Sequence, residues 1–183
     1  MLDKKLTEEQ VSTVWATLKK RYDARVVDKK KSKLMKTVGY LMGKFGPMSA
    51  NDFAGYVTTV KRTIYYPDKD EIGHGNQEQL EQQIELAAHE FTHVIQNIGY
   101  KYLFSSALLT KYETDAFIAT MEMHHYITGI AYSTAYVILK LKAYGVDRSD
   151  LIYAKDKLDA ARKMIKRGHY RSDTVKIIIG VLE

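Results

Sequence analysis

The chain has 183 residues, of which 45% are hydrophobic and 27% are charged, a composition that is typical of a globular protein and argues against disorder. It contains no cysteine, so disulfide scaffolds, cysteine-ligated zinc fingers and cysteine nucleophiles are excluded. A bound metal would therefore need His, Asp and Glu as its ligands.

The formal net charge is +6, and it is concentrated in one segment. Between Lys19 and Lys36 the chain carries nine basic and two acidic residues. The simplest interpretation is a solvated helix or loop. The alternative is a surface that contacts an acidic partner, which could be a nucleic acid, an acidic protein or an anionic surface.

No segment has the pattern of a targeting or membrane-spanning sequence. The first ten residues, MLDKKLTEEQ, lack the apolar core of a secretory signal peptide. The longest nearly apolar stretches, residues 131–141 and 175–182, are shorter than the roughly 20 residues that cross a bilayer. We therefore expect a soluble protein with no signal peptide and no membrane span, located in the cytoplasm or in a virion or other particle.

The N-terminal third predicts two helices and then a small β unit. Residues 7–10 (TEEQ) have the pattern of a capping box, and apolar residues at helical spacing follow, so a helix is expected over residues 8–22. A second, short helix is expected around residues 34–42. Residues 56–60 and 63–66 are rich in β-branched and aromatic types and predict one or two strands.

The remainder of the chain reads as mostly helical. A helix is expected from about residue 78 to residue 97, with Gly99 as its stop, and a long helical stretch from about 111 to 144, interrupted near Gly129. Another helix follows, capped by Ser149 or Asp150 and ending at Gly168. Residues 174–182 fit a strand or a short helix. The predicted fold class is α+β, mostly helical, with a helical C-terminal part.

One motif carries chemistry. Residues 89–93 read HEFTH, which is H-E-x-x-H on a predicted helix. Histidines at positions i and i+4 lie about 40° apart around a helix, so His89 and His93 can reach the same metal ion. The intervening Glu90 lies near the same side, where it could accept a proton from a metal-activated water.

The surroundings of the motif strengthen this interpretation. The apolar residues of the helix fall on the opposite side, whereas Gln82, Glu85 and Gln96 share the histidine side and predict a solvated cleft. Glu113 follows His93 by 20 residues and could complete a His₂Glu site with a fourth position left for water. The strand at residues 63–66 could form one wall of the cleft and offer its edge to an extended peptide.

The sequence HEFTHVIQ followed by YETDA resembles the gluzincin-type zinc metallopeptidases over roughly residues 57–120. The resemblance implies a zincin-like active-site helix with a small β unit before it, and a Zn²⁺ ion as cofactor. It also implies that His89, His93 and Glu113 are the metal ligands and that Glu90 is the general base. Peptide or protein would be the substrate.

The length and the order of the predicted elements fit a single domain. Residues 1–183 would form a single zincin-like domain, which begins with a basic helical segment at 1–46. The metal-site region would cover 50–120 and the helical C-terminal part 121–183.

The sequence departs from this family at one position. Many members have an Asp four residues after the ligand Glu, where it orients the first histidine, but this chain has Phe117. Asp115 lies only two residues after Glu113, about 200° around the helix, so it is either structural or an alternative ligand. We expect His89 to find a hydrogen-bond partner other than residue 117, such as a backbone carbonyl or a distant carboxylate.

Other histidines and tyrosines are weaker candidates. His124 shares the side of Glu113 but lies about 16 Å further along a straight helix, too far for the same metal. His74, in a polar loop, could reach over the cleft. Several tyrosines are close enough in sequence to stabilise an oxyanion, although packing is the commoner role of each: Tyr100, Tyr102, Tyr112, Tyr126 and Tyr132.

Two functions of different classes follow. The first is a zinc metallopeptidase. The intact Glu90 supports it, because zinc binding alone does not require this residue. The second is a structural or binding component of a larger assembly, for example a virion protein, that retains the scaffold without using it for hydrolysis. The missing Asp and the small size of the chain favour the second.

Overall fold

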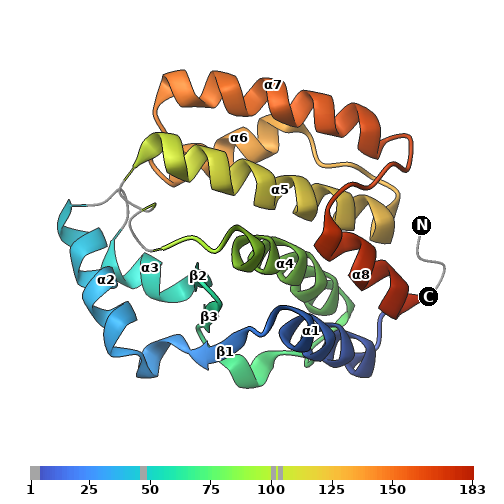
Figure 1. The fold of residues 1–183 in the computed structure, drawn as a ribbon, viewed down its shortest axis with the longest axis horizontal. Coiled ribbons are helices and arrows are strands. Elements are labelled where there is room, and N and C mark those ends of the chain that lie inside the picture. The colour runs from blue at the N-terminus through green and yellow to red at the C-terminus, as the bar shows by residue number, and fades with distance from the viewer. Residues whose placement is uncertain (1–4, 46–48, 100–101, 103–104) are drawn as a thin grey trace.

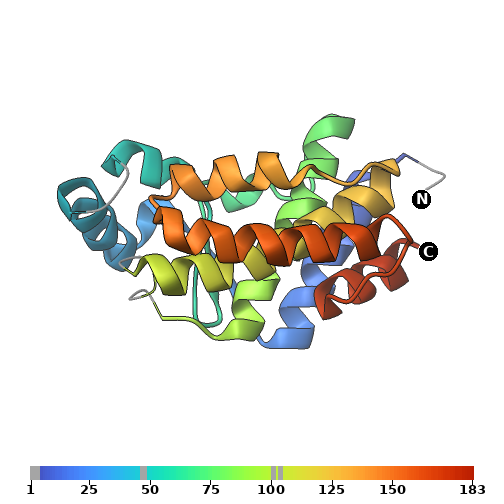
Figure 2. The ribbon, with the colours of Figure 1, turned by 90° about the horizontal axis from the view of Figure 1, so that it is seen from above.

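The computed structural model describes residues 5–45, 49–99, 102 and 105–183, and over these residues the fold is α+β and mostly helical, as predicted. Two long antiparallel helices, α4 (Gln77–Gln96) and α5 (Ser106–Thr128), lie side by side at the centre (Figure 1). Helices α6 (Thr134–Ala143) and α7 (Arg148–Ile165) cover α5 on the side away from α4 (Figure 2). Helices α1 (Glu8–Tyr22) and α8 (Asp173–Leu182) pack against α4 and against each other.

The N-terminal helix confirms the local signals of the sequence. Thr7 and Gln10 form the capping box, since each side chain bonds the backbone N–H of the other residue. The buried stripe on α1 includes Trp15, which packs edge-on against Phe91 of α4 with ring centroids 5.6 Å apart. The short 3-10 turn η1 (Lys29–Lys31), then α2 (Lys33–Phe45) and α3 (Ala50–Gly55), follow.

A three-stranded sheet connects these helices to α4. Its order is β1 (Arg25–Asp28), β3 (Thr63–Tyr66), β2 (Thr58–Val60), with β1 parallel and β2 antiparallel to β3. The expectation that residues 63–66 offer a free edge was wrong, because β3 is paired on both sides. The outer strand next to α4 is β2 instead.

Several boundaries differ from those predicted, each for a local reason. Helix α4 ends one turn before Gly99 because Asn97 adopts the left-handed conformation (φ 51°) that closes the helix. The interruption expected near Gly129 is confirmed, because Gly129 (φ 75°) caps α5, but α5 begins at Ser106, before the expected residue 111. Asp147 takes the N-cap position of α7 rather than Ser149 or Asp150. Of the two alternatives for the C-terminal segment, strand or short helix, the structure has the helix.

The core has two main parts that meet at the α4–α5 pair. One part lies among α1, α4, α8 and the sheet, and the other among α5, α6 and α7. No helix in the described parts of the chain is both long and apolar enough to cross a membrane.

Candidate metal centre

The structure brings His89, His93 and Glu113 together between α4 and α5. His89 Nε2 lies 3.3 Å from Glu113 Oε2, and His93 Nε2 lies 3.3 Å from Glu113 Oε1. All three potential ligand atoms lie within 4.8 Å of one another, and all three residues are buried. Within the described residues, no fourth His, Asp or Glu belongs to this group. This arrangement could hold a metal ion.

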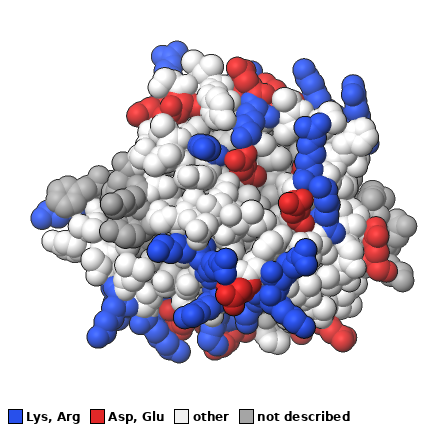
Figure 3. All heavy atoms as spheres, in the orientation of Figure 1, with Lys and Arg blue, Asp and Glu red and all other residues white. Residues whose placement is uncertain are grey.

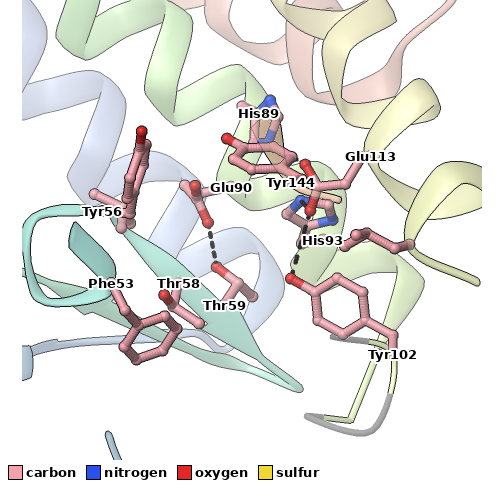
Figure 4. A pocket seen from close by; sticks show the side chains of 12 residues that line it. Phe53, Tyr56, Thr58, Thr59, His89, Glu90, His93, Tyr102, Glu113 and Tyr144 are labelled. Carbon is pink, nitrogen blue, oxygen red and sulfur yellow. Dashed lines mark hydrogen bonds and ion pairs between the residues drawn. The ribbon is translucent and has the colours of Figure 1, made fainter. Parts of the chain in front are cut away.

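The three residues open onto a cavity of about 60 Å³, which has room for an ion and a few water molecules (Figure 4). Strand β2 and helix α3 form one wall, and Tyr102 contributes to another. The residues that line it, besides the three ligands, are Phe53, Tyr56, Val57, Thr58, Thr59, Glu90, Tyr102, Leu109 and Tyr144.

Both imidazoles are held with the nitrogen nearest Glu113 ready for a metal. The hydroxyl of Thr120 donates to the Ala116 carbonyl, so towards His89 Nδ1, at 3.1 Å, it acts as the acceptor. Gln96 donates its amide to the Tyr112 carbonyl, which turns its oxygen towards His93 Nδ1 at 2.8 Å. Each ring can therefore keep a proton on Nδ1, so that Nε2, which faces Glu113 in the metal-free protein, is the nitrogen left to bind a metal.

The expectation about residue 117 is confirmed. His89 has a partner other than Phe117, although that partner is a threonine hydroxyl rather than a carbonyl or a carboxylate. The Phe117 ring instead packs edge-on against His89, with centroids 5.0 Å apart, and stacks on Tyr144. An apolar ring thus excludes water beside the first ligand.

The charges of the group are strongly coupled. Burial alone would lower the pKa of His93, but the Glu113 carboxylate beside it raises that pKa to about 9. Burial would likewise raise the pKa of Glu113, yet the charge of His93 and hydrogen bonds from both imidazoles hold it well below its usual range. When no metal is bound, the proton on His93 takes the place of the cation.

Glu90 lies in the same cavity but outside the ligand group. Its Oε2 accepts a hydrogen bond of 2.7 Å from the Thr59 hydroxyl on β2, and the side chain is buried (Figure 4). The bond to Thr59 fixes the direction of one carboxylate oxygen. The other oxygen keeps its lone pairs for a proton.

Asp115 faces away from the cavity. Its carboxylate pairs with Lys157 of α7 at 2.6 Å, on the other side of α5. The geometry therefore favours Glu113 over Asp115 as the carboxylate of the site.

The prediction of a solvated cleft around Glu85 was wrong. Glu85 is buried, and it accepts hydrogen bonds from His124 Nδ1 at 2.7 Å and from the Tyr132 hydroxyl at 3.0 Å. His124 is thus engaged with Glu85 rather than with the site. His74 is exposed, and its Nδ1 lies 3.5 Å from a Glu8 carboxylate oxygen.

Sequence reasoning missed several residues of the cavity. Tyr144 lies between Glu90 and Glu113 in Figure 4, and burial followed by the charge of Glu113 raises its pKa well above the usual value. No sequence signal connects it to the motif. Tyr102, which the sequence did suggest, directs its hydroxyl at Glu113 Oε1 over 3.5 Å. Tyr100 lies outside the described residues.

Lys29 is also unexpected, because it belongs to the basic segment but is buried. Its ammonium donates to the carbonyls of Phe53 and Tyr56 and to the Thr58 hydroxyl, at 2.5 to 2.7 Å. All three acceptors lie in the cavity wall, so this lysine joins α3 to β2.

No family model, curated protein or solved structure matches the chain. The chemistry therefore has to be argued from the site itself.

Proposed function

We propose that the protein is a zinc-dependent peptidase in which His89, His93 and Glu113 hold the metal and Glu90 is the general base. The observation that carries the proposal is the composition of the cavity: two histidines and a carboxylate, which are side chains that zinc binds, with a second carboxylate, Glu90, beside them. A structural zinc site is closed by four protein ligands, whereas a catalytic site has three and leaves a position open. The described residues offer three.

The side chains fit the roles that hydrolysis requires. Zinc held there would lower the pKa of a water molecule and polarise a carbonyl group. Glu90 would accept the proton of the attacking water and return it to the leaving amine. Because its pKa is raised, the Tyr144 phenol stays protonated and could donate to the developing oxyanion. Phe117 would keep bulk water away from His89.

The alternative is a structural or binding component that retains the scaffold. Glu90 argues against it, because a buried carboxylate that receives a hydrogen bond from only Thr59 among the described residues is costly to keep in a site that only holds the fold. The two functions predict different results in one experiment.

That experiment is elemental analysis of the purified protein, covering iron and manganese as well as zinc, combined with hydrolysis of casein and of fluorogenic peptides. We expect close to one zinc per chain in the parent, in Glu90→Gln and in Asp115→Ala, and loss of zinc in Glu113→Ala. Hydrolysis should be abolished in Glu90→Gln, because the amide keeps the size but cannot accept the proton.

Three results would count against the proposal. Equal zinc retention in the Glu113 and Asp115 variants would remove Glu113 from the ligand set. Peptide cleavage by Glu90→Gln at the parent rate would remove Glu90 as the base. A zinc-loaded parent that cleaves no peptide would favour the binding or structural alternative.

A further inference from the structure

The basic residues between 19 and 36 do not form one surface, because β1 separates them. At its Asp28 end the charge is balanced: Lys31 lies 3.4 Å from Asp28, and the acidic turn η2 (Lys69–Glu71) lies beside the strand. There Lys69 and, more weakly, Lys31 lower the pKa of Asp70. This end of the sheet is a mixture of both signs.

The opposite end of β1 gains further positive charge. Parallel pairing places Arg25 beside β3, and its backbone N–H donates to the Arg62 carbonyl at 2.8 Å. The β2–β3 turn therefore joins the C-terminal end of α1. Together they make a surface that we call the basic end of the sheet, composed of the exposed side chains of Lys19, Lys20, Arg21, Arg25, Lys61 and Arg62.

Two acidic residues lie near this surface: Asp23, and Asp173 of α8, whose charge adds to burial in raising the pKa of Tyr22 at the end of α1. Asp23 lies within it and pairs with Arg62 at 3.3 Å, but both side chains are largely exposed, so the pair is weak. Figure 3 shows Lys and Arg gathered over the lower part of the molecule, where α1 and β1 lie in Figure 1. A concentration of one sign steers and retains partners of the opposite sign.

The basic end of the sheet borders the cavity. Thr58 and Thr59 line the cavity, and Lys61 follows Thr59 by two residues, about 7 Å along an extended chain. The backbone N–H of Lys61 donates to the Ile98 carbonyl at 2.6 Å, and Tyr102, four residues after Ile98, also lines the cavity. The residues of β2 are themselves buried, so the cavity and the basic end of the sheet are linked by the short step from Thr59 to Lys61.

We propose that the basic end of the sheet selects polypeptide substrates that carry acidic residues a few positions from the bond placed at the metal centre. The inference rests on the proposed function, since it assigns a substrate class to the same site. A polypeptide fits better than a nucleic acid, because the cations of this surface are not interleaved with exposed aromatic side chains for stacking bases.

The test measures binding without hydrolysis, so it does not depend on turnover. Zinc-loaded Glu90→Gln protein is titrated against fluorescent peptides of one sequence with three Glu, three Gln or three Lys, placed before or after an apolar centre. We expect the Glu peptide to bind at least about tenfold more tightly than the Gln peptide, with an advantage that falls as salt is raised.

A matched pair of variants locates the effect. Arg25→Gln/Lys61→Gly/Arg62→Gln removes three cations from the surface, and glycine suits the left-handed backbone at residue 61 (φ 53°), so folding is retained. Lys163→Gln/Lys166→Gln/Arg167→Gln removes three exposed cations near the end of α7. The first variant should lose the preference for the Glu peptide, and the second should keep it.

Several outcomes would overturn the inference: equal binding of the Glu and Gln peptides, equal loss in both variants, or no binding of any peptide. If single-stranded DNA displaced the bound fluorescent Glu peptide at a lower concentration than the unlabelled Glu peptide does, the surface would be assigned to nucleic acid instead. None of these results bears on whether the parent hydrolyses casein, so the proposed function stands or fails separately.

Discussion

At the scale of single residues, the two partners that orient the histidines are as informative as the ligands. Thr120 and Gln96 each bond an Nδ1 atom, and each is fixed by a second bond to a backbone carbonyl. Partners of this kind raise the basicity of an imidazole and hold its orientation. The Gln of the HEFTHVIQ stretch therefore has a physical role at the site.

Gln96→Ala should weaken zinc binding roughly 10- to 100-fold while leaving the helix intact, because His93 loses the acceptor that fixes its ring. Competition with a chromophoric zinc chelator measures the change. Gln82→Ala, on an exposed position of the same helix, is the matched control and should leave the affinity unchanged. An unaltered affinity in Gln96→Ala would show that His93 needs no such partner.

At the scale of elements, the sequence predicted what local signals determine and missed what distant pairing determines. The α1 capping box lies within four residues, so its helix could be located in advance. Strand β1 is a four-residue stretch inside a basic segment, and it exists because β3, about 38 residues later, pairs with it. The burial of Lys29 could not be predicted for the same reason. In the sequence it resembles the exposed lysines beside it, and the groups that accept its hydrogen bonds come from α3 and β2, far along the chain.

Lys29→Met should destabilise the protein by roughly 1 to 3 kcal/mol, because the methionine keeps the apolar stem but leaves the Phe53 and Tyr56 carbonyls without their donor. Urea denaturation at neutral pH measures the change. Lys30→Met, on the exposed neighbour, should alter stability by less than about 0.5 kcal/mol. Equal effects of the two substitutions would show that the buried ammonium contributes nothing to the cavity wall.

At the scale of the whole molecule, the residues of the candidate metal site affect stability even when no metal is bound. The motif identified both histidines and a carboxylate 20 residues away, but it said nothing of Tyr144, which comes from the end of α6 and enters the cavity through tertiary packing. The same packing buries an ionised pair between α4 and α5. The stability of the metal-free protein should therefore depend on pH.

The pair stabilises the metal-free fold within a defined window. The raised pKa of His93, about 9 against 6.5, contributes stability that is fully present below pH 6.5 and is lost as pH rises through 9. The lowered pKa of Glu113 contributes stability that is present above its ordinary value of 4.5 and is lost as pH falls. The difference in unfolding free energy between the parent and Glu113→Gln, measured in chelator, should be largest near pH 5 to 7. A difference that grows between pH 7 and 10 would contradict the coupling.

The polar contacts along α4 and α5 have a consequence for how an ion would arrive. Glu85 bonds His124, His89 bonds Thr120, and Gln96 bonds the Tyr112 carbonyl. Hydrogen bonds thus join α4 to α5 at three positions along their length. A shift of either helix by one residue would break these bonds and leave buried polar groups unpaired. The register of the two helices is thus set by contacts that involve no metal. Uptake of the ion would then require passage through the cavity mouth and release of a proton, but no folding step, so its rate should follow access rather than rearrangement of the chain.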